Sequence, residues 1–499
     1  MKRVALALLI APVILIAGPG GWEPWPSGTP ALQARAIEVR DSVAIATAFR
    51  VPGNYQILPG TYRGNFVVSA DDVTVEATGV RFEPEDRGRA ALTILGSRVR
   101  ITGLVVANGA PDRDTINVGA NGIATLEELP RDVTLVRVTA EAGPNGGHRG
   151  FGLHGIDIKL LDCRATGFWE NGRDSQAIWI NNGPGPYLVE GGYFEASGEN
   201  IMVGGALFGI RNPAVIPSDI TIRHAHLKKP LEWQGGEGRP KRGTVKNLFE
   251  LKAGQRVLVE DCLLENNWKD GQAGSAILIK ADNQEGVTPW VVTRDVTFRR
   301  NVIRNSPDSY VVNIRGIHPA SPTRRTANVT FEHNLFVGVT NGIQAGDGVG
   351  GLRVVRNTFL TITGTFLNFY GTGVDQGGED EERARAVERP PAAHDPQRAP
   401  IDPPHRLPDR PRPSGRFRTP LTFVGNVLHS GAYGVKGEGK ASGIDTLEYY
   451  AQVLDFSRNV IERGSRAIPY PPGNTIVGPG ALLGLLDPSS LKYPGDAGY

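Results

Sequence analysis

The segments Asp295-Val-Thr-Phe-Arg-Arg-Asn301 and Asn328-Val-Thr-Phe-Glu-His-Asn334 decide the fold of this 499-residue chain. In both, the second and fourth residues are apolar and the third is polar, which is the alternation of a half-buried β-strand. A unit this short cannot bury its own apolar face, so recurrence every ~25–40 residues indicates a stacked solenoid. We predict an all-β fold, a single-stranded right-handed parallel β-helix. Further copies begin at Asp72, Arg98, Asp132, Asp157, Pro186, Asp219, Arg256, Gly351, Pro420 and Val453.

The seventh position of the later copies is always asparagine. Asparagine tolerates left-handed backbone, and its side-chain amide can bond the same amide in the next coil. The pattern therefore predicts an interior asparagine ladder at a tight turn, although simple turn-forming asparagines are the alternative. The two cysteines, Cys163 and Cys262, occupy the same position three coils apart, or roughly 14 Å at ~4.8 Å per coil, so we expect both to be buried and unpaired. The asparagines are Asn301, Asn334, Asn357, Asn426 and Asn459.

The N-terminus has the pattern of a secretory signal. Lys2 and Arg3 precede an apolar run from Val4 to Ala17, which is short for a membrane span. We expect a secreted or periplasmic protein with no membrane span once the signal is removed, and an uncleaved anchor is the alternative. The predicted organisation is a signal at 1–17, an N-terminal cap at 18–57 with helix-compatible periodicity from Ala31 to Phe49, the β-helix at 58–370, a disordered insert rich in Pro, Arg and Glu at 371–419, and the last coils with a C-terminal tail at 420–499.

The overall charge excludes one class of partner. The formal net charge is only +2, so nothing global favours nucleic acid, and any site for a charged ligand must be local. We expect a monomer. His224 and His226 lie on one face of a strand without a third ligand nearby, so no metal site is predicted.

A second strand in each coil carries the candidate site. Three cations stacked at ~4.8 Å steps repel one another by roughly 1 kcal/mol or more each, so something should compensate them. Glu250 and Asp282 could do so in part, and a bound polyanion could do so better, because the step is close to the length of one sugar unit. The aligned outward columns are Trp179, Met202, Glu250, Leu278, Asn313 and Gln344, and beside them Asn181, Gly204, Lys252, Lys280, Arg315 and Gly346.

These residues suggest elimination at a uronate sugar. That reaction needs a cation to neutralise the carboxylate and a base to remove the neighbouring proton. We predict Lys252 as the base, with its pKa lowered by the other cations, Lys280 and Arg315 as the neutralising groups, and Glu250 as the group that orients Lys252. Inverting hydrolysis would need two placed carboxylates, and the columns offer chiefly Glu250. The alternative is that the cations are solvated surface charges. The predicted substrate-binding residues are Asn181, Trp179, Asn313 and Trp268, although an indole that packs a loop is the alternative for each tryptophan.

Two resemblances accompany these patterns. Ile57-Leu-Pro-Gly-Thr-Tyr62 and the Val-Thr-Phe coils resemble the pectate-lyase-like parallel β-helix proteins. Gly198-Glu-Asn-Ile-Met-Val-Gly-Gly205, Lys246-Asn-Leu-Phe-Glu-Leu-Lys252 and Leu264-Glu-Asn-Asn-Trp268 resemble a bacterial exported group of unknown activity, over nearly the whole mature chain. This likeness implies the fold and brings no reaction.

A weaker similarity is to the chondroitinase B and alginate lyase family. It implies a lysine base at Lys252 and places Lys280, or Arg315 one coil later, where that family has an arginine. The family's calcium-binding acidic residues have only a partial counterpart, so the cofactor is unknown, with calcium as the candidate. The function expected from the sequence is an exported carbohydrate-active protein that binds an acidic polysaccharide or other glycan and cleaves it as a lyase. The alternative is a non-catalytic or structural β-helix that binds glycan or the cell envelope.

Overall fold

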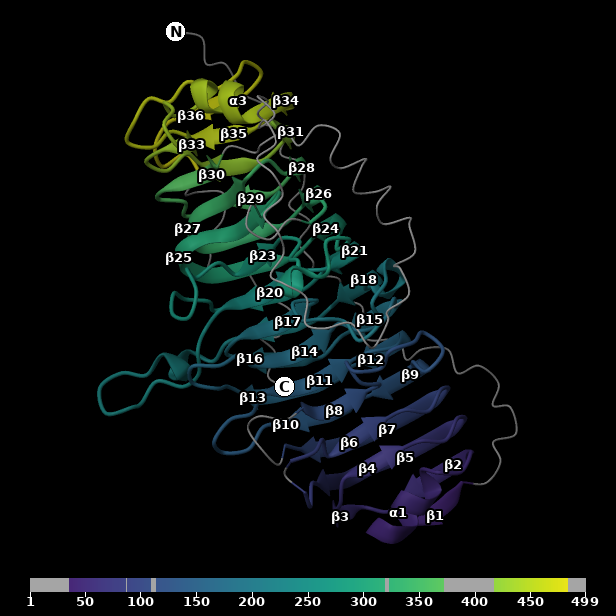
Figure 1. Cartoon of the computed structure of the whole chain (residues 1–499). Coiled ribbons are helices and arrows are strands. Elements are labelled where there is room, and N and C mark those ends of the chain that lie inside the picture. The colour runs from purple at the N-terminus through teal and green to yellow at the C-terminus, as the bar shows by residue number, and fades with distance from the viewer. Residues whose placement is uncertain (1–35, 87, 109–113, 319–322, 372–416, 483–499) are drawn as a thin grey trace, which may run out of the picture. The chain divides into compact units, whose positions relative to one another are not determined.

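The computed structural model describes residues 36–86, 88–108, 114–318, 323–371 and 417–482. The predictions for the signal and for nearly all of the insert lie outside these residues. The described residues from Ile37 onward form one compact unit in which every pairing between named strands is parallel. The unit is the predicted right-handed parallel β-helix, with coils stacked one on another (Figure 1). Among the described residues, no helix has the length and apolar character needed to cross a bilayer.

Three sheets run along the stack, and each coil contributes to them in the same order. The first, which we call the repeat sheet, contains the seven-residue repeats. Its strands are β1 (Ile37–Val39), β2 (Gly53–Ile57), β5 (Val73–Glu83), β7 (Val99–Ala107), β9 (Arg131–Val136), β12 (Ile156–Leu161), β15 (Tyr187–Glu190), β18 (Ser218–Arg223), β21 (Gly254–Glu260), β24 (Thr293–Arg299), β26 (Ala327–Glu332), β28 (Gly350–Val355), β31 (Thr419–Val424) and β34 (Ala451–Ser457).

The second sheet follows the asparagine turn. Its strands are β3 (Gly60–Arg63), the later parts of β5 and β7, β10 (Thr139–Glu141), β13 (Arg164–Phe168), β16 (Tyr193–Ala196), β19 (His226–Lys228), β22 (Leu263–Glu265), the early parts of β25 (Val302–Arg315) and β27 (Leu335–Gly346), β29 (Thr358–Phe359), β32 (Val427–His429), β35 (Val460–Glu462) and β36 (Thr475–Val477).

The third sheet, which we call the site sheet, carries the candidate residues. Its strands are β4 (Phe66–Val68), β6 (Leu92–Ile94), β8 (Asp114–Val118), β11 (Arg149–Leu153), β14 (Gln176–Ile180), β17 (Glu199–Val203), β20 (Asn247–Leu251), β23 (Ile277–Ile279), the later parts of β25 and β27, β30 (Thr365–Tyr370) and β33 (Gly434–Gly437).

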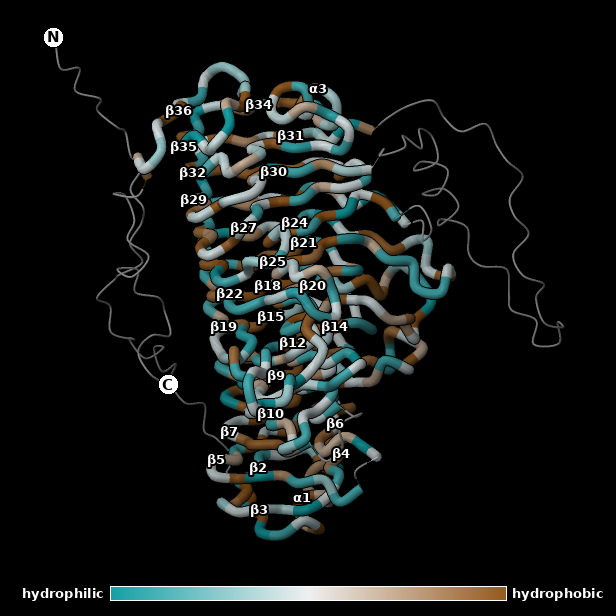
Figure 2. The backbone as a smooth tube through the Cα atoms, turned by 90° about the vertical axis from the view of Figure 1, so that its left-hand side faces the viewer, coloured by the Kyte–Doolittle hydropathy of each residue, from teal (hydrophilic) through white to brown (hydrophobic). Residues whose placement is uncertain are grey.

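Side-chain alternation fills the interior. The second and fourth repeat residues, such as Val296 and Phe298, are fully buried, and hydrophobic stretches recur from coil to coil (Figure 2). Like residues stack on like residues: the rings of Phe298 and Phe331 are 5.2 Å apart and nearly parallel. The last coil departs from the pattern, because a register irregularity beyond Leu421 leaves Leu454 63% exposed, where the repeat predicts an inward residue.

The asparagine ladder is confirmed and is longer than predicted. The Nδ2 of Asn301 donates to Oδ1 of Asn334 at 3.0 Å, and the same contact continues through every later rung. A further rung, Asn474, accepts from Asn459 at 2.7 Å. The predicted reason was partly wrong. The left-handed residue is not the asparagine but the one before it, such as Arg300 (φ 54°) or His333 (φ 56°).

The first repeat position is also left-handed, which explains its preference for aspartate and asparagine. Side chains at this position bond between coils: Arg98 to Asp72 at 2.7 Å and Arg256 to Asp219 at 2.6 Å. Cys163 and Cys262 are both buried and free, as expected.

Short helices lie at the ends and corners. Within the described part of the range expected to be helical, 36–49, the helix is α1 (Ser42–Ala48), where the Asp41 side chain accepts from the Ala44 backbone N–H. The preceding β1 instead pairs with β2. The other helices in the described residues are α3 (Ile444–Tyr450) and three short 3₁₀ turns at Pro213–Val215, Leu231–Gln234 and Gln284–Gly286.

Candidate functional site

The strand register brings the predicted columns together. Trp179 pairs with Met202, Met202 with Glu250, Glu250 with Leu278, Leu278 with Asn313 and Asn313 with Gln344. Ile279 pairs with Ile314, so Lys280 and Arg315 follow on adjacent coils, and the Lys280 N–H donates to the carbonyl oxygen of Leu251 beside Lys252. Lys252, Lys280 and Arg315, which we call the cation row, are therefore consecutive on one face of the site sheet.

Each cation has a carboxylate partner, and two of these partners, Glu250 and Asp282, are the ones that the sequence suggested. Lys252 Nζ lies 3.2 Å from Glu250 Oε1, and Lys280 Nζ lies 3.1 Å from Asp282 Oδ2. Arg315 Nε donates to Asp347 Oδ2 at 2.7 Å, a partner from the next coil that the sequence analysis did not find. The row thus alternates in sign, and repulsion between the cations alone does not require a polyanion.

Lys252 differs from its prediction in a second way. Burial disfavours its ammonium form, but the carboxylates of Glu250 and Glu199 more than offset this, so its pKa is raised from 10.5 and not lowered. The Lys252 side chain is 14% exposed and the Glu250 side chain is 1% exposed, so the pair lies in the wall of the site sheet with only the lysine reaching solvent.

Glu199 is the main residue that sequence reasoning missed. It is fully buried at the start of β17 and accepts from Gln176 Nε2 at 2.8 Å. Lys246 Nζ lies 3.5 Å from its other oxygen and also pairs with Asp174. Alternation from the inward Ile201 would turn Glu199 into the barrel, which is why the column analysis passed over it.

Two buried carboxyls therefore meet beside Lys252. Burial, and then the neighbouring charge of Glu250, raise the pKa of Glu199 from 4.5 to about 8. Glu250 lies within hydrogen-bonding reach of Glu199. This supplies the second carboxylate that hydrolysis would need, but glycosidase carboxyls are typically ~5 Å or more apart with the sugar between them. Contact between the two carboxyls does not suit that role.

A buried lysine, Lys229, holds together the two strands that carry the carboxyl pair. Lys229 is fully buried at the end of β19, and its Nζ has five oxygen acceptors at 2.8–3.1 Å. Three are backbone carbonyls of the turn before Glu199, one is the side chain of Asn200, and one is the carbonyl of Asn247 at the start of β20. The ammonium thereby joins the two strands that carry the carboxyl pair. Burial lowers its pKa, and the charge of Glu199 opposes that shift.

The predicted substrate-binding residues divide into two groups. Asn313 is half-buried beside the row, and its Oδ1 has no hydrogen-bond partner among the described residues. Asn181 is fully buried. Trp179 is buried, donates from Nε1 to the Gly204 carbonyl at 2.9 Å and carries Arg149 over its ring. Trp268 is buried in a small cluster with Trp169, Trp233 and Val245. Both indoles pack against protein and present no open face for a sugar.

The row does not fit calcium. Ca²⁺ takes about six to eight oxygen ligands, and in the described parts of the chain no three His, Cys, Asp or Glu side chains converge. The Glu199–Glu250 pair is instead contacted by the ammonium groups of Lys246 and Lys252, which would repel a dication. His226 is no free ligand either, because its Nε2 lies 2.9 Å from Glu265 Oε1.

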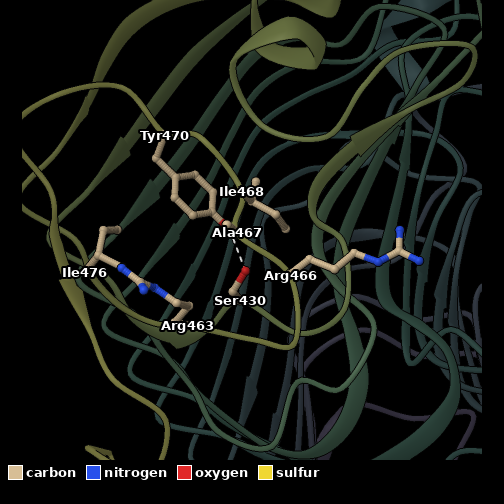
Figure 3. A pocket seen from close by; sticks show the side chains of 7 residues that line it. All are labelled: Ser430, Arg463, Arg466, Ala467, Ile468, Tyr470 and Ile476. Atoms are coloured by element: carbon tan, nitrogen blue, oxygen red, sulfur yellow. Dashed lines mark hydrogen bonds between the residues drawn. The ribbon is translucent and has the colours of Figure 1, made fainter.

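A small pocket of about 170 Å³ lies elsewhere, among the C-terminal coils. Its lining includes Tyr470, whose hydroxyl lies 2.6 Å from Ser430 Oγ, and Arg463, while the guanidinium of Arg466 extends away from the other lining side chains (Figure 3). None of the predicted site residues lines it.

No family model and no curated protein matches this chain. Similar proteins are found among solved structures. One match is a mannuronic acid specific family 6 polysaccharide lyase from human gut microbiota, with TM-score 0.44 and 14% identity over 88% of this chain and 82% of that one. Another is a family 6 polysaccharide lyase of Pseudopedobacter saltans, with TM-score 0.42 and 12% identity over 88% and 91%. The surface protein and adhesin PfbA of Streptococcus pneumoniae matches with TM-score 0.37 and 11% identity over 89% and 100%. Likenesses this weak carry no argument about what this chain does.

Proposed function

We propose that this chain is an exported carbohydrate-active protein and that the cation row receives an acidic polysaccharide and cleaves it by β-elimination at a uronate. The observation that carries the proposal is the row itself: three partly exposed cations on consecutive coils, in register, at a repeat of ~4.8 Å that approximates one sugar unit.

The row divides naturally into roles. Lys280 and Arg315 neutralise the uronate carboxylate, which acidifies the proton on the adjacent carbon. Lys252, in its neutral form, takes that proton; the bond from the next carbon to the glycosidic oxygen breaks, a carbon–carbon double bond forms, and the leaving oxygen takes up a proton. Asn313, half-buried beside the row, contributes to binding of the sugar. Glu250 holds Lys252 in place.

A non-catalytic glycan binder is the second candidate. It is favoured by the raised pKa of Lys252, which leaves little neutral lysine at neutral pH, and by the carboxylate partner of each cation. Mixed charges along a β-helix face suit hydroxyl-rich ligands without any bond being broken.

The test offers the purified protein alginate, pectate, chondroitin and heparin, with ultraviolet absorbance reporting the unsaturated uronate. The Lys252→Ala variant should lose about a hundredfold or more of the rate, as expected for removal of a general base. Lys159→Ala is the matched control, because Lys159 is also a half-buried lysine paired with a carboxylate, Asp157 at 3.0 Å, but on the repeat sheet.

Absence of product from every polymer would reject the lyase proposal for these substrates. Binding of the same polymers, measured by calorimetry, would then decide for the second candidate if it is retained by the wild-type protein and weakened in Arg315→Ala. Equal loss of activity in Lys252→Ala and Lys159→Ala would remove Lys252 from the reaction.

A further inference from the structure

The pair formed by Glu199 and Glu250 has two carboxyl oxygens that accept no hydrogen bond from the residues that the structure describes. Glu199 uses Oε2 to accept from Gln176, and Glu250 uses Oε1 to pair with Lys252. The two remaining oxygens, Glu199 Oε1 and Glu250 Oε2, are buried and accept no hydrogen bond among the described residues, although Lys246 Nζ lies 3.5 Å from the first. An unsatisfied buried acceptor destabilises a fold, more so when it is charged, so two of them on carboxyls within hydrogen-bonding reach call for an explanation.

A single proton explains both oxygens. Two ionised carboxylates in contact repel strongly, whereas one carboxylic acid donates to the other carboxylate and satisfies both groups at once. We propose that Glu199 and Glu250 share one proton, and that this proton, in place of a metal ion, sets the net charge of the cation row. The raised pKa of Glu199, to about 8, is in line with this arrangement.

The charged groups around the carboxyl pair determine how the proton changes the local net charge. Lys246 and Lys252 face it from the β20 side, and Lys229 lies behind it. From the β14 side come Gln176, which accepts from Arg149 Nε at 3.0 Å, and Asp174, which pairs with Lys246. No other charged contact to the pair is recorded in the described part of the chain.

The shared proton changes the net charge beside the cation row. With the proton in place, the pair carries one negative charge against the two positive charges of Lys246 and Lys252; without it, the pair carries two. Loss of the proton therefore removes one net positive charge from beside the row. An anionic glycan should bind more tightly to the protonated form, and by linkage its binding should raise the proton affinity of the pair. Only this last step rests on the proposed function.

The proton itself can be observed without any ligand. Infrared spectroscopy in the presence of a chelator should show one protonated carboxyl at pH 6 that disappears as the pH rises through about 8. The band should be absent in Glu199→Gln, whose amide replaces the shared proton with an N–H donor. In Glu250→Gln the titration midpoint should fall, because the like charge has gone.

Glu265→Gln is the matched control. Glu265 is also buried, and although burial raises its pKa, hydrogen bonds from His226 and Arg304 lower it to about 2, so its removal should leave the band unchanged. A wild-type protein without the band at pH 6, or a band that survives in both Glu199→Gln and Glu250→Gln, would overturn the proposal. Loss of the band on addition of stoichiometric Ca²⁺ would overturn it in favour of a metal.

Stability gives a second readout that needs no activity. The folded pKa of Glu199 lies above its unfolded value of 4.5, so its contribution to stability is fully present below pH 4.5 and is lost as the pH rises through about 8. Between pH 6 and pH 9 the wild-type protein should therefore lose stability relative to Glu199→Gln. The comparison is between the two proteins because both contain Lys229, whose pKa of about 7 makes it titrate in the same interval. Over the same interval, affinity for an oligouronate should fall about three- to tenfold more in wild type than in Glu199→Gln. A glycan that never binds would contradict only the proposed function, because the band and the stability change require no glycan.

Discussion

Two rows of side chains run along this β-helix, and they differ in how completely their polar atoms are hydrogen-bonded. The asparagine ladder repeats one neutral residue, and each amide both donates to the next rung and accepts from the previous one. The cation row on the site sheet is accompanied by carboxylates. Buried oxygens on the neighbouring residues Glu199, Glu250 and Asn313 accept no hydrogen bond in the described part of the chain. A row that satisfies itself serves the fold, whereas a row that stacking alone does not satisfy has capacity left for a proton or a ligand.

The largest effect is expected for Lys229, the buried lysine that lies behind the carboxyl pair beside the cation row. Replacing Lys229 by Met removes the ammonium and strands five acceptors beside the Glu199 carboxyl, so we expect a loss of about 3–5 kcal/mol in the free energy of unfolding. Chemical denaturation followed by circular dichroism measures it.

Lys228→Met is the control for that change, because this neighbouring side chain at the end of β19 is half-buried and lies 3.7 Å from Glu265. If the two variants lost equal stability, the five contacts of Lys229 would have no special weight.

A smaller effect is expected within the ladder. Asn357→Ala leaves the backbone N–H of Asn334 and its side-chain amide without their acceptor, which should cost about 1–3 kcal/mol. The loss should be the same at pH 6 and pH 9, because nothing in the ladder titrates. A pH-dependent loss would place the ladder under the influence of charge and would weaken the contrast between the two rows.

The smallest effect is expected outside both rows. Arg256 and Asp219 form a two-point contact on the exposed face of the repeat sheet, with both side chains about half exposed. Surface pairs of this kind contribute about 0–1 kcal/mol, so Arg256→Ala should shift the denaturation midpoint little, and less in high salt. A loss as large as that of Asn357→Ala would show that exposed inter-coil pairs hold the stack together.

The sequence was sufficient for whatever depends on strict repetition. The apolar pairs up to the last coil, the asparagine rungs and the register of Lys252, Lys280 and Arg315 all follow from aligning the seven-residue repeats and the strands that follow them, although the coils differ in length. It was insufficient at the corners, where alternation stops. Lys228 and Lys229 are neighbours in the sequence, yet only the second is fully buried, and Glu199 meets Glu250 although counting from Ile201 points it inward.

Partners from another coil were the other gap. Asp347 joins Arg315 across 32 residues of sequence, a contact that composition and spacing do not predict.

One rung of the ladder also bears on how such a chain can grow. Asn357 and Asn426 are 69 residues apart but are joined at 3.2 Å, while the next rung joins residues only 33 apart at 3.0 Å. Doubling the length of a closed loop costs only about 0.6 kcal/mol of chain entropy. The connection between β30 and β31 is therefore a place where sequence can be gained or lost with little change in stability, and a foreign domain could be inserted there while the rungs on either side keep their register.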